Sequence, residues 1–285
     1  MARILKGQDA TRAINENNLS MIQKLARAGI EPCLGLIRVG EKNDDIAYEH
    51  GIEKRCAGLG IRIEKYVLDA QASTEEVLEV IRRLNKDRNV HGVLLFRPLP
   101  RHIDADTVQN ALAPAKDVDG MTRASLDGIF TGDAIGFPPC TPAACIKILE
   151  HYGIDPCGAD VTVIGRSLVI GRPLALMLLG KNATVTICHT KTKNLSQKAR
   201  NADILVASAG RAGMVTEEFL RSGQTVIDVG INFGPDGKMC GDLDADAADR
   251  ITDAYTPVPG GVGSVTTSVL AEHVVRAAMR ENGIA

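Results

Sequence analysis

Two glycines and a serine in the middle of the chain have the context of a dinucleotide site. The stretch V-T-V-I at 161–164 favours a strand, the loop after it carries Gly165, Ser167 and Gly171, and an apolar helical stretch leads to a second strand at 184–188. Glycine lets the backbone approach a pyrophosphate, and a helix N-terminus offers N–H groups to anionic oxygens. The pattern predicts a β-loop-α-β dinucleotide site; the alternative is a turn that only packs helix against sheet.

The end of the second strand indicates which dinucleotide is bound. An NAD site usually places an acid about 20 residues after the first glycines, whereas a 2′-phosphate favours arginine there. Here the strand is followed by His189, Thr190, Lys191 and Lys193, with Arg166 in the first loop and no acid among them. We therefore predict NADP rather than NAD, the alternative being that these lysines only form a solvated strand end.

The hydrophobic pattern predicts the elements that position these residues. Short β-favouring runs alternate with amphipathic stretches along the whole chain. This alternation predicts an α/β fold with parallel sheets covered on both faces. Strands are expected at 33–39, 61–68, 90–96, 161–164, 184–188, 203–208 and 225–230, and helices at 7–29, 46–59, from 73 onward, 142–152, 216–221, 244–254 and 265–282.

A ligand of such a sheet is expected beyond the carboxyl ends of its strands. In the first half of the chain three stretches follow strands or lie near their ends: 40–48, 96–100 and 115–121. We expect them to meet. The predicted boundaries are a first α/β domain at 1–141, joined by the C-terminal helix 265–285, and a Rossmann-like dinucleotide-binding domain at 142–264.

Length and composition limit the possible classes. A chain of 285 residues suits two domains of ordinary size. A net charge of −2 gives no long-range attraction to nucleic acid or to an anionic membrane. No apolar run approaches the roughly 20 residues of a membrane span, and the start lacks a signal peptide, so a cytoplasmic protein is expected. Seven cysteines without a C-x-x-C pair indicate neither a metal site nor a disulfide framework.

Six motifs together resemble one family, that of the methylenetetrahydrofolate dehydrogenase/methenyltetrahydrofolate cyclohydrolases, the FolD proteins. They are K-D-V-D-G (116–120), P-C-T-P (139–142), V-I-G-R-S-L-V-I-G-R-P (163–173), V-I-D-V-G-I-N (226–232), G-D-L (241–243) and P-V-P-G-G-V-G (257–263). The resemblance implies a homodimer of two α/β domains with a cleft between them. It also implies oxidation of 5,10-methylenetetrahydrofolate with NADP, followed by hydrolysis of the methenyl product to 10-formyltetrahydrofolate.

The resemblance also assigns roles by position. Tyr48 resembles the tyrosine that lines the folate site, and Asp119 resembles the aspartate that hydrogen-bonds the pterin; a half-buried core tyrosine and a turn-forming aspartate are the alternatives. Tyr48 and Asp119 are the expected catalytic residues. The expected substrate-binding residues are Tyr48, Phe96, Pro98, Leu99, Asp119, Gly260, Gly261 and Val262. The expected cofactor-binding residues are Gly165, Arg166, Ser167, Gly171, His189, Thr190 and Ile231.

The sequence departs from the family pattern where the second reaction is carried out. Ile52 stands four residues after Tyr48, where the family has the lysine that drives the cyclohydrolase step, and Phe96 replaces the family's glutamine. Lys54 is six residues after Tyr48, about 240° around a helix, and cannot replace the lysine. Hydride loss needs mainly positioning, whereas hydrolysis needs a titratable group. We therefore predict a retained dehydrogenase with a weak or absent cyclohydrolase, unless Asp45, Glu49 or His50 compensates.

Three other interpretations remain at this point. The protein is bifunctional with a relocated base, or it binds NADP or folate without catalysis, or it is another two-domain dehydrogenase such as the shikimate type. The last should carry its own lysine and aspartate pair in the first domain, and the sequence shows none there.

Overall fold

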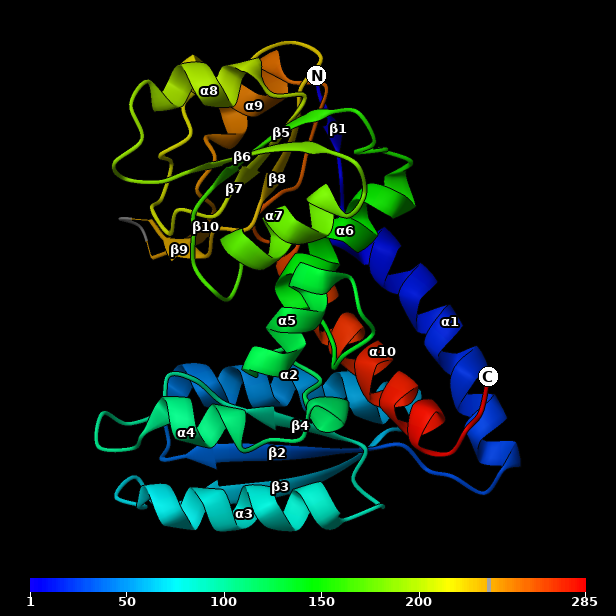
Figure 1. The fold of residues 1–285 in the computed structure, drawn as a ribbon. Coiled ribbons are helices and arrows are strands. Elements are labelled where there is room, and N and C mark those ends of the chain that lie inside the picture. Colours follow the sequence, from blue (N-terminus) through cyan, green and yellow to red (C-terminus); the bar gives the residue numbers. More distant parts are fainter. Residues whose placement is uncertain (235–236) are drawn as a thin grey trace. The chain divides into compact units, whose positions relative to one another are not determined.

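A computed structural model describes residues 1–234 and 237–285, and these divide into two compact units (Figure 1). One unit, which contains the predicted dinucleotide site and is called the dinucleotide unit below, comprises Met1–Ala13 and Thr141–Thr266. The other unit comprises Ile14–Cys140 and Thr267–Ala285. The boundaries predicted from the sequence place residues 1–13 in the first domain. They lie instead with the dinucleotide unit, because strand β1 (Arg3–Ile4) pairs with strand β11 (Ala254–Tyr255) of that unit.

The dinucleotide unit contains a six-stranded sheet in the order β1-β11-β8-β7-β5-β6. Every pairing in it is parallel, as the alternating pattern predicts. Leu205 and Val226 are fully buried in this sheet, and Ala199 and Ala248 of the covering helices pack into the same core. The remaining strands are β5 (Asp160–Ile164), β6 (Thr184–Cys188), β7 (Ile204–Ala207) and β8 (Thr225–Asp228), and the helices are α6 (Cys140–Tyr152), α7 (Gly171–Leu179), α8 (Leu195–Asn201) and α9 (Ala245–Ile251).

Two predicted helices of this unit are shorter than expected. The segment expected at 216–221 is only the 3₁₀ turn η2 (Glu217–Phe219), because Leu220 is already extended at φ −108° and ψ 152°. Helix α9 ends at Ile251, and the chain then forms the short strand β11. A two-stranded antiparallel hairpin, β9 (Asn232–Phe233) with β10 (Met239–Cys240), was also not predicted. Two-residue strands are too short to show a hydrophobic alternation.

The other unit is built on the three-stranded parallel sheet β3-β2-β4. All seven residues of β2 are buried, as expected for a strand covered on both faces. Helices α3 and α4 cover one face, where Ile81 and Val108 pack against Ile37 and Val93. The elements are β2 (Cys33–Val39), α2 (Asn43–Leu59), β3 (Arg62–Leu68), α3 (Thr74–Lys86), β4 (Gly92–Leu95), α4 (Ala105–Asn110), η1 (Pro114–Lys116) and α5 (Arg123–Thr131).

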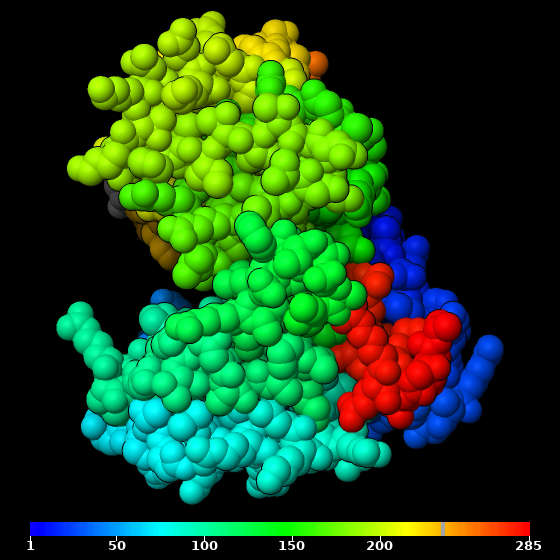
Figure 2. Space-filling view, in the orientation of Figure 1, coloured from blue at the N-terminus to red at the C-terminus, as the bar shows by residue number. Residues whose placement is uncertain are grey.

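Two long helices, α1 (Gly7–Arg27) and α10 (Gly263–Glu281), each contribute residues to both units. They lie side by side in Figure 2, where α1 is blue and α10 red, and Asn18 Nδ2 donates to the Ser268 carbonyl at 3.2 Å. This contact joins α1 to α10 within the unit that comprises Ile14–Cys140 and Thr267–Ala285. Among the described residues, no helix combines the length and apolarity needed to cross a membrane.

Candidate active site

The loop after β5 has a backbone shape that depends on its glycines. Gly165 has φ +133°, and a Cβ atom there would collide with Ser208, the residue directly after the neighbouring strand β7. At Gly171 a Cβ atom would collide with the carbonyl group of Gly165 itself. Both ends of the loop therefore require glycine. A backbone cradle without side chains is what close approach of a pyrophosphate demands, so the residues present fit a dinucleotide.

Ser167 closes the same loop. Its Oγ accepts from the backbone N–H of Ile170 at 3.0 Å and of Gly171 at 3.5 Å. These amides belong to Ile170, which precedes helix α7, and to Gly171, its first residue, so the hydroxyl ties the loop to the start of the helix. Ser167 therefore shapes the loop, and its predicted contact with the cofactor remains a prediction.

The residues expected to choose between NADP and NAD reach one edge of the sheet. Ile164 at the end of β5 is paired with Cys188 at the end of β6. Arg166 and Thr190 each lie two residues beyond that pair and are not buried. His189 is half-buried and fixes the following turn, in which its Nδ1 accepts from the Lys191 N–H at 3.1 Å. The structure thus gathers the predicted basic and hydroxyl groups where a 2′-phosphate could be held.

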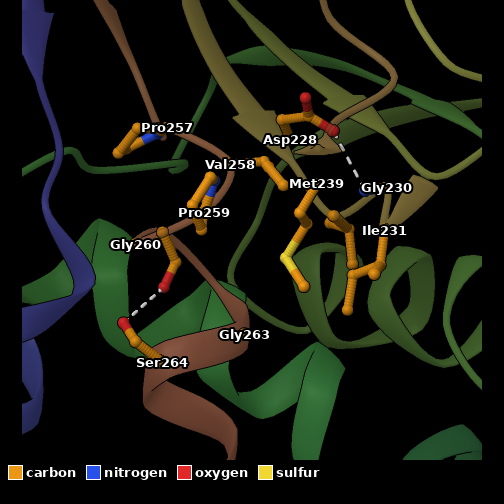
Figure 3. A pocket seen from close by; sticks show the side chains of 12 residues that line it. Asp228, Gly230, Ile231, Met239, Pro257, Val258, Pro259, Gly260, Gly263 and Ser264 are labelled. Carbon is orange, nitrogen blue, oxygen red and sulfur yellow. Dashed lines mark hydrogen bonds between the residues drawn. The ribbon is translucent and has the colours of Figure 1, made fainter. Parts of the chain in front are cut away.

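A cavity of about 300 Å³ opens in the dinucleotide unit between 228–231 and the Pro-Gly loop 257–264 (Figure 3). Ile231 is 62% exposed at this cavity, and Gly260 and Gly261 line it. Figure 3 shows Ile231 and Met239 beside one another in the cavity wall. Val262, expected at the folate edge, is only 2% exposed and is not among the lining residues. The short aliphatic Val262 packs inward, and the glycines before it form the surface.

Asp228 forms the buried end of this cavity. Its Oδ1 accepts from the N–H groups of Gly230 at 2.9 Å and Asp242 at 3.1 Å, and its Oδ2 accepts from Leu243 at 3.0 Å. Burial raises the pKa of Asp228 to about 6, although these three hydrogen bonds oppose the shift. The carboxyl group holds the turn at Gly230, which lines the cavity, to the backbone of Asp242 and Leu243.

The raised pKa of Asp228 predicts a pH-dependent stability. Because the native pKa exceeds the ordinary 3.8, the native state binds more protons than the unfolded state between about pH 4 and pH 6, and stability falls as pH rises through that window. The full effect is about 3 kcal/mol. In Asp228→Asn this titration is absent, so the stability of the variant relative to wild type should rise by about that amount from pH 4 to pH 7. Urea unfolding across this range measures it, and a pH-independent difference would contradict it.

Asp242 of the G-D-L motif has a structural role that the sequence did not indicate. It is fully buried, its Oδ2 accepts from the Gly210 N–H at 3.0 Å, and its Oδ1 accepts from the Arg211 N–H at 2.8 Å. Asn232 Nδ2 donates to the same Oδ1 at 2.9 Å. Asp242 therefore fixes the loop after β7. The G-D-L motif drew attention to Asp242, but the loop that Asp242 binds lies about 30 residues earlier in the chain, and no sequence signal connects the two.

The other unit brings together the three stretches expected beyond its strands. Tyr48 packs edge-on against Phe96, with ring centroids 6.1 Å apart at an interplanar angle of 78°. Lys42 Nζ donates to the carbonyl oxygen of Pro98 at 2.7 Å. Arg97 Nη2 and Asp119 Oδ2 form an ion pair at 2.9 Å. Tyr48 is 38% exposed, so one side of this cluster remains open.

The two aspartates of K-D-V-D-G differ in burial and in role. Asp117 is fully buried and accepts from the N–H groups of Met121 at 3.0 Å and Thr122 at 2.8 Å. It thereby fixes the turn that presents Asp119, whose side chain is 22% exposed. Burial raises the pKa of Asp119, while Arg97 opposes the rise. Asp119 is thus the partly exposed acid of this motif, and it lies beside a cation.

The positions that depart from the family pattern carry no titratable group. Ile52 is 1% exposed and Phe96 is 6% exposed, so both belong to the core. Glu49, one candidate for compensation, is buried and bonded to Arg38 at 2.9 Å and Lys65 at 2.8 Å. Burial would raise the pKa of Glu49, but these partners outweigh it and hold the pKa below the ordinary value. Glu49 is therefore committed to a structural ion network.

The substrate-binding residues expected next to Phe96 divide between surface and core. Pro98 is exposed, whereas Leu99 is partly buried and packs against the hydrophobic core of α3 and the sheet. Sequence reasoning missed Arg97 and Lys42. Arg97 stands between two expected residues, but its partner Asp119 is distant in the chain, and nothing in the sequence pairs them.

Both parts of the chain match models of one protein family. A family model described as the tetrahydrofolate dehydrogenase/cyclohydrolase catalytic domain matches residues 5–119, and the NAD(P)-binding domain of the same family matches residues 139–282. The bifunctional protein FolD of Clostridioides difficile (strain 630) is 47% identical over 280 residues, 98% of each chain.

Solved structures of similar proteins superpose on nearly the whole length of this chain. The crystal structure of the bifunctional enzyme FolD-methylenetetrahydrofolate dehydrogenase/cyclohydrolase from Campylobacter jejuni gives a TM-score of 0.95 at 38% identity, covering 98% of this chain and 99% of that one. Trypanosoma brucei FolD, a methylenetetrahydrofolate dehydrogenase-cyclohydrolase complexed with NADP and an inhibitor, gives 0.91 at 31% identity, covering 98% of each.

Proposed function

This chain belongs to the tetrahydrofolate dehydrogenase/cyclohydrolase family, and we propose that it oxidises 5,10-methylenetetrahydrofolate to 5,10-methenyltetrahydrofolate with NADP. The observation that carries the proposal is the combination on one chain of the glycine cradle at Gly165 and Gly171 with a partly exposed acid, Asp119, in the matched catalytic domain. Family membership argues against the shikimate-type alternative. The cradle argues against a protein that binds folate alone.

The proposed reaction asks little acid–base chemistry of the protein. Nicotinamide accepts the hydride when the dinucleotide is bound. The two nitrogens beside the methylene carbon stabilise the cation that hydride loss creates, so the protein has to hold that carbon in place. Asp119 would bind the pterin and Tyr48, supported from below by Phe96, would contact the face of the ring, while the loop from Gly165 to Gly171 would hold the phosphates.

A spectrophotometric assay tests this function. Purified protein is given 5,10-methylenetetrahydrofolate with either NADP or NAD, and formation of the reduced cofactor and of the methenyl product is followed. The proposal expects reduced cofactor to form, with an equal amount of methenyl product if no hydrolysis follows and with less if the methenyl product is hydrolysed. Absence of turnover with bound dinucleotide would favour the non-catalytic alternative.

Arg166 should carry the preference for NADP. An arginine at the 2′-phosphate contributes a charge-assisted hydrogen bond, worth about 1.5–3 kcal/mol. Arg166→Ser is expected to raise the KM for NADP roughly 10- to 100-fold while leaving the KM for NAD nearly unchanged. Steady-state kinetics with both cofactors measure this, and an equal loss for NADP and NAD would show that Arg166 does not read the 2′-phosphate.

Hydrolysis of the methenyl product is a second candidate activity. The relatives named bifunctional favour it, so the findings support the alternative with two activities better than the expected loss of the second. One feature of this chain also favours it: the Lys42 ammonium is held on the Pro98 carbonyl, in the loop that begins with Phe96. Ile52 and Phe96 argue for a slow step, because neither can move a proton.

Lys42→Met separates the two cases. If Lys42 supplies the missing ammonium, the variant should lose methenyl hydrolysis by roughly 100-fold, the usual range of one general acid–base group. Its dehydrogenase rate should stay within a few-fold of wild type. Decay of the methenyl absorbance measures this, against the buffer rate and against Lys54→Met, an exposed lysine of the helix that Lys42 precedes, as control. Wild-type decay at the buffer rate would instead identify a dehydrogenase without cyclohydrolase. The expected homodimer and cytoplasmic location remain predictions.

A further inference from the structure

The ion pair between Arg97 and Asp119 sets a hydrogen-bond donor beside an acceptor at one edge of the folate-binding unit. Arg97 Nη2 lies 2.9 Å from Asp119 Oδ2, and each side chain is 22% exposed. Asp117 fixes the turn under Asp119 through two backbone N–H groups and the hydroxyl of Ser125, at 2.6 Å. The acid is therefore held rigidly, and the guanidinium is placed by the acid.

Much of the hydrogen-bonding capacity of the pair is still available. A guanidinium carries five N–H donors, and in the described part of the chain Arg97 makes one side-chain hydrogen bond, to Asp119 Oδ2. A carboxylate has about four lone-pair sites, and the side chain of Asp119 is partly open to solvent. Cys140 lies close enough to lower the pKa of Asp119, but a thiol is a weak donor and competes poorly with an amide N–H. A ligand that offers one donor next to one acceptor therefore matches the pair.

A 2-amino-4-oxo pterin offers that pattern. Its N3–H group is a donor and the neighbouring O4 is an acceptor, so the two stand side by side on one ring edge. A carboxylate reads only the donors of this edge. A guanidinium beside it adds recognition of the oxo group, because it has donors and no acceptor. A 2,4-diamino ring places a donor at position 4 and would face the guanidinium with donor against donor.

We propose that Arg97 is a specificity-determining residue of this enzyme, donating to the 4-oxo group of the pterin while the Asp119 carboxylate accepts from N3–H. This inference rests on the proposed function and names how its substrate is selected. The family resemblance assigned a role to Asp119 but none to Arg97, and this inference adds that second residue. The two side chains together select an oxo group at position 4 over an amino group.

Binding of two ligands to the full-length protein tests the assignment. Isothermal titration measures Kd for tetrahydrofolate and for its 2,4-diamino analogue, in wild type, Arg97→Leu, Arg97→Lys and the control Arg82→Leu. Arg82 pairs with Glu75 on an exposed part of α3, so its loss removes an arginine–carboxylate pair of the same unit. Wild type and the control should prefer the 4-oxo ligand.

Arg97→Leu should weaken tetrahydrofolate binding roughly 10- to 100-fold and the diamino analogue much less, so that the preference collapses. Arg97→Lys, which keeps the charge and a donor, should retain part of it and guards against a variant that merely fails to fold. In steady state the KM for the folate should rise while the KM for NADP stays unchanged.

The outcomes separate the two claims. If wild type turns over the folate and Arg97→Leu keeps its preference for the 4-oxo ligand, the assignment of Arg97 is overturned and the proposed function stands. An unchanged folate KM in Arg97→Leu would likewise overturn the assignment and leave the proposed function intact. If wild type binds neither ligand and shows no turnover, the proposed function and this inference both fail.

Discussion

Replacing Gly171 by alanine is expected to weaken dinucleotide binding and to lower the dehydrogenase activity roughly 100-fold. The added Cβ would collide with the carbonyl oxygen and carbon of Gly165, which are backbone atoms and cannot rotate away. The loop must then separate from the start of α7. A displacement of about 1 Å at a positioned site lowers rates about 100-fold, and overpacking lowers stability by about 1–3 kcal/mol.

Gly180→Ala provides the matched control for this prediction. It lies at the other end of the same helix with φ −62°, and an added Cβ would be 3.5 Å from the nearest carbonyl oxygens, an ordinary contact. This variant should bind NADP as wild type does. Fluorescence titration with NADP compares the two variants. Normal NADP affinity in Gly171→Ala would show that the loop does not hold the phosphates.

Asp119→Asn should be the most damaging change on the folate side. It removes the anion proposed to bind the pterin and leaves the guanidinium of Arg97 without its carboxylate partner. Truncating one member of such a pair lowers binding by about 2–5 kcal/mol, so kcat/KM for the folate should fall by roughly 30- to 5000-fold. The Kd for NADP should not change, because the family model places the dinucleotide in the other domain.

The control for Asp119 is Asp106→Asn. Asp106 pairs with Arg123 at 2.6 Å, but their side chains are 66% and 76% exposed, and exposed pairs contribute little. Its kinetics should match wild type. If Asp119→Asn also kept its kcat/KM, the folate would have to bind elsewhere. A parallel fall in NADP affinity would instead indicate general damage to the fold.

The fold class could be predicted because it depends on repeated local patterns. Buried β2 and amphipathic α3 are long enough for their periodicity to be visible, and the Ser73–Glu76 capping box that begins α3 is a local signal. The membership of residues 1–13 could not be predicted. It depends on β1 pairing with β11, a contact between two-residue strands that lie at opposite ends of the chain and show no pattern.

The candidate site was predictable to the extent that motifs carry it. Gly165, Gly171 and Asp119 could be predicted as site residues because each stands in a distinctive run. Arg97 was missed because an arginine after a strand is ordinary by itself, and its meaning comes from the ion pair with Asp119. Val262 was assigned through its neighbours, yet its apolar side chain is buried. Motifs locate loops, whereas side-chain direction depends on packing.

Transfer of a labelled hydrogen tests the central claim most directly. The protein is incubated with NADP and 5,10-methylenetetrahydrofolate carrying deuterium on the methylene carbon, and the reduced cofactor is analysed by NMR and mass spectrometry. Direct transfer between two positioned carbons predicts deuterium at C4 of the nicotinamide ring, with none in the solvent. Reduced cofactor without deuterium, or label released into water, would contradict the account.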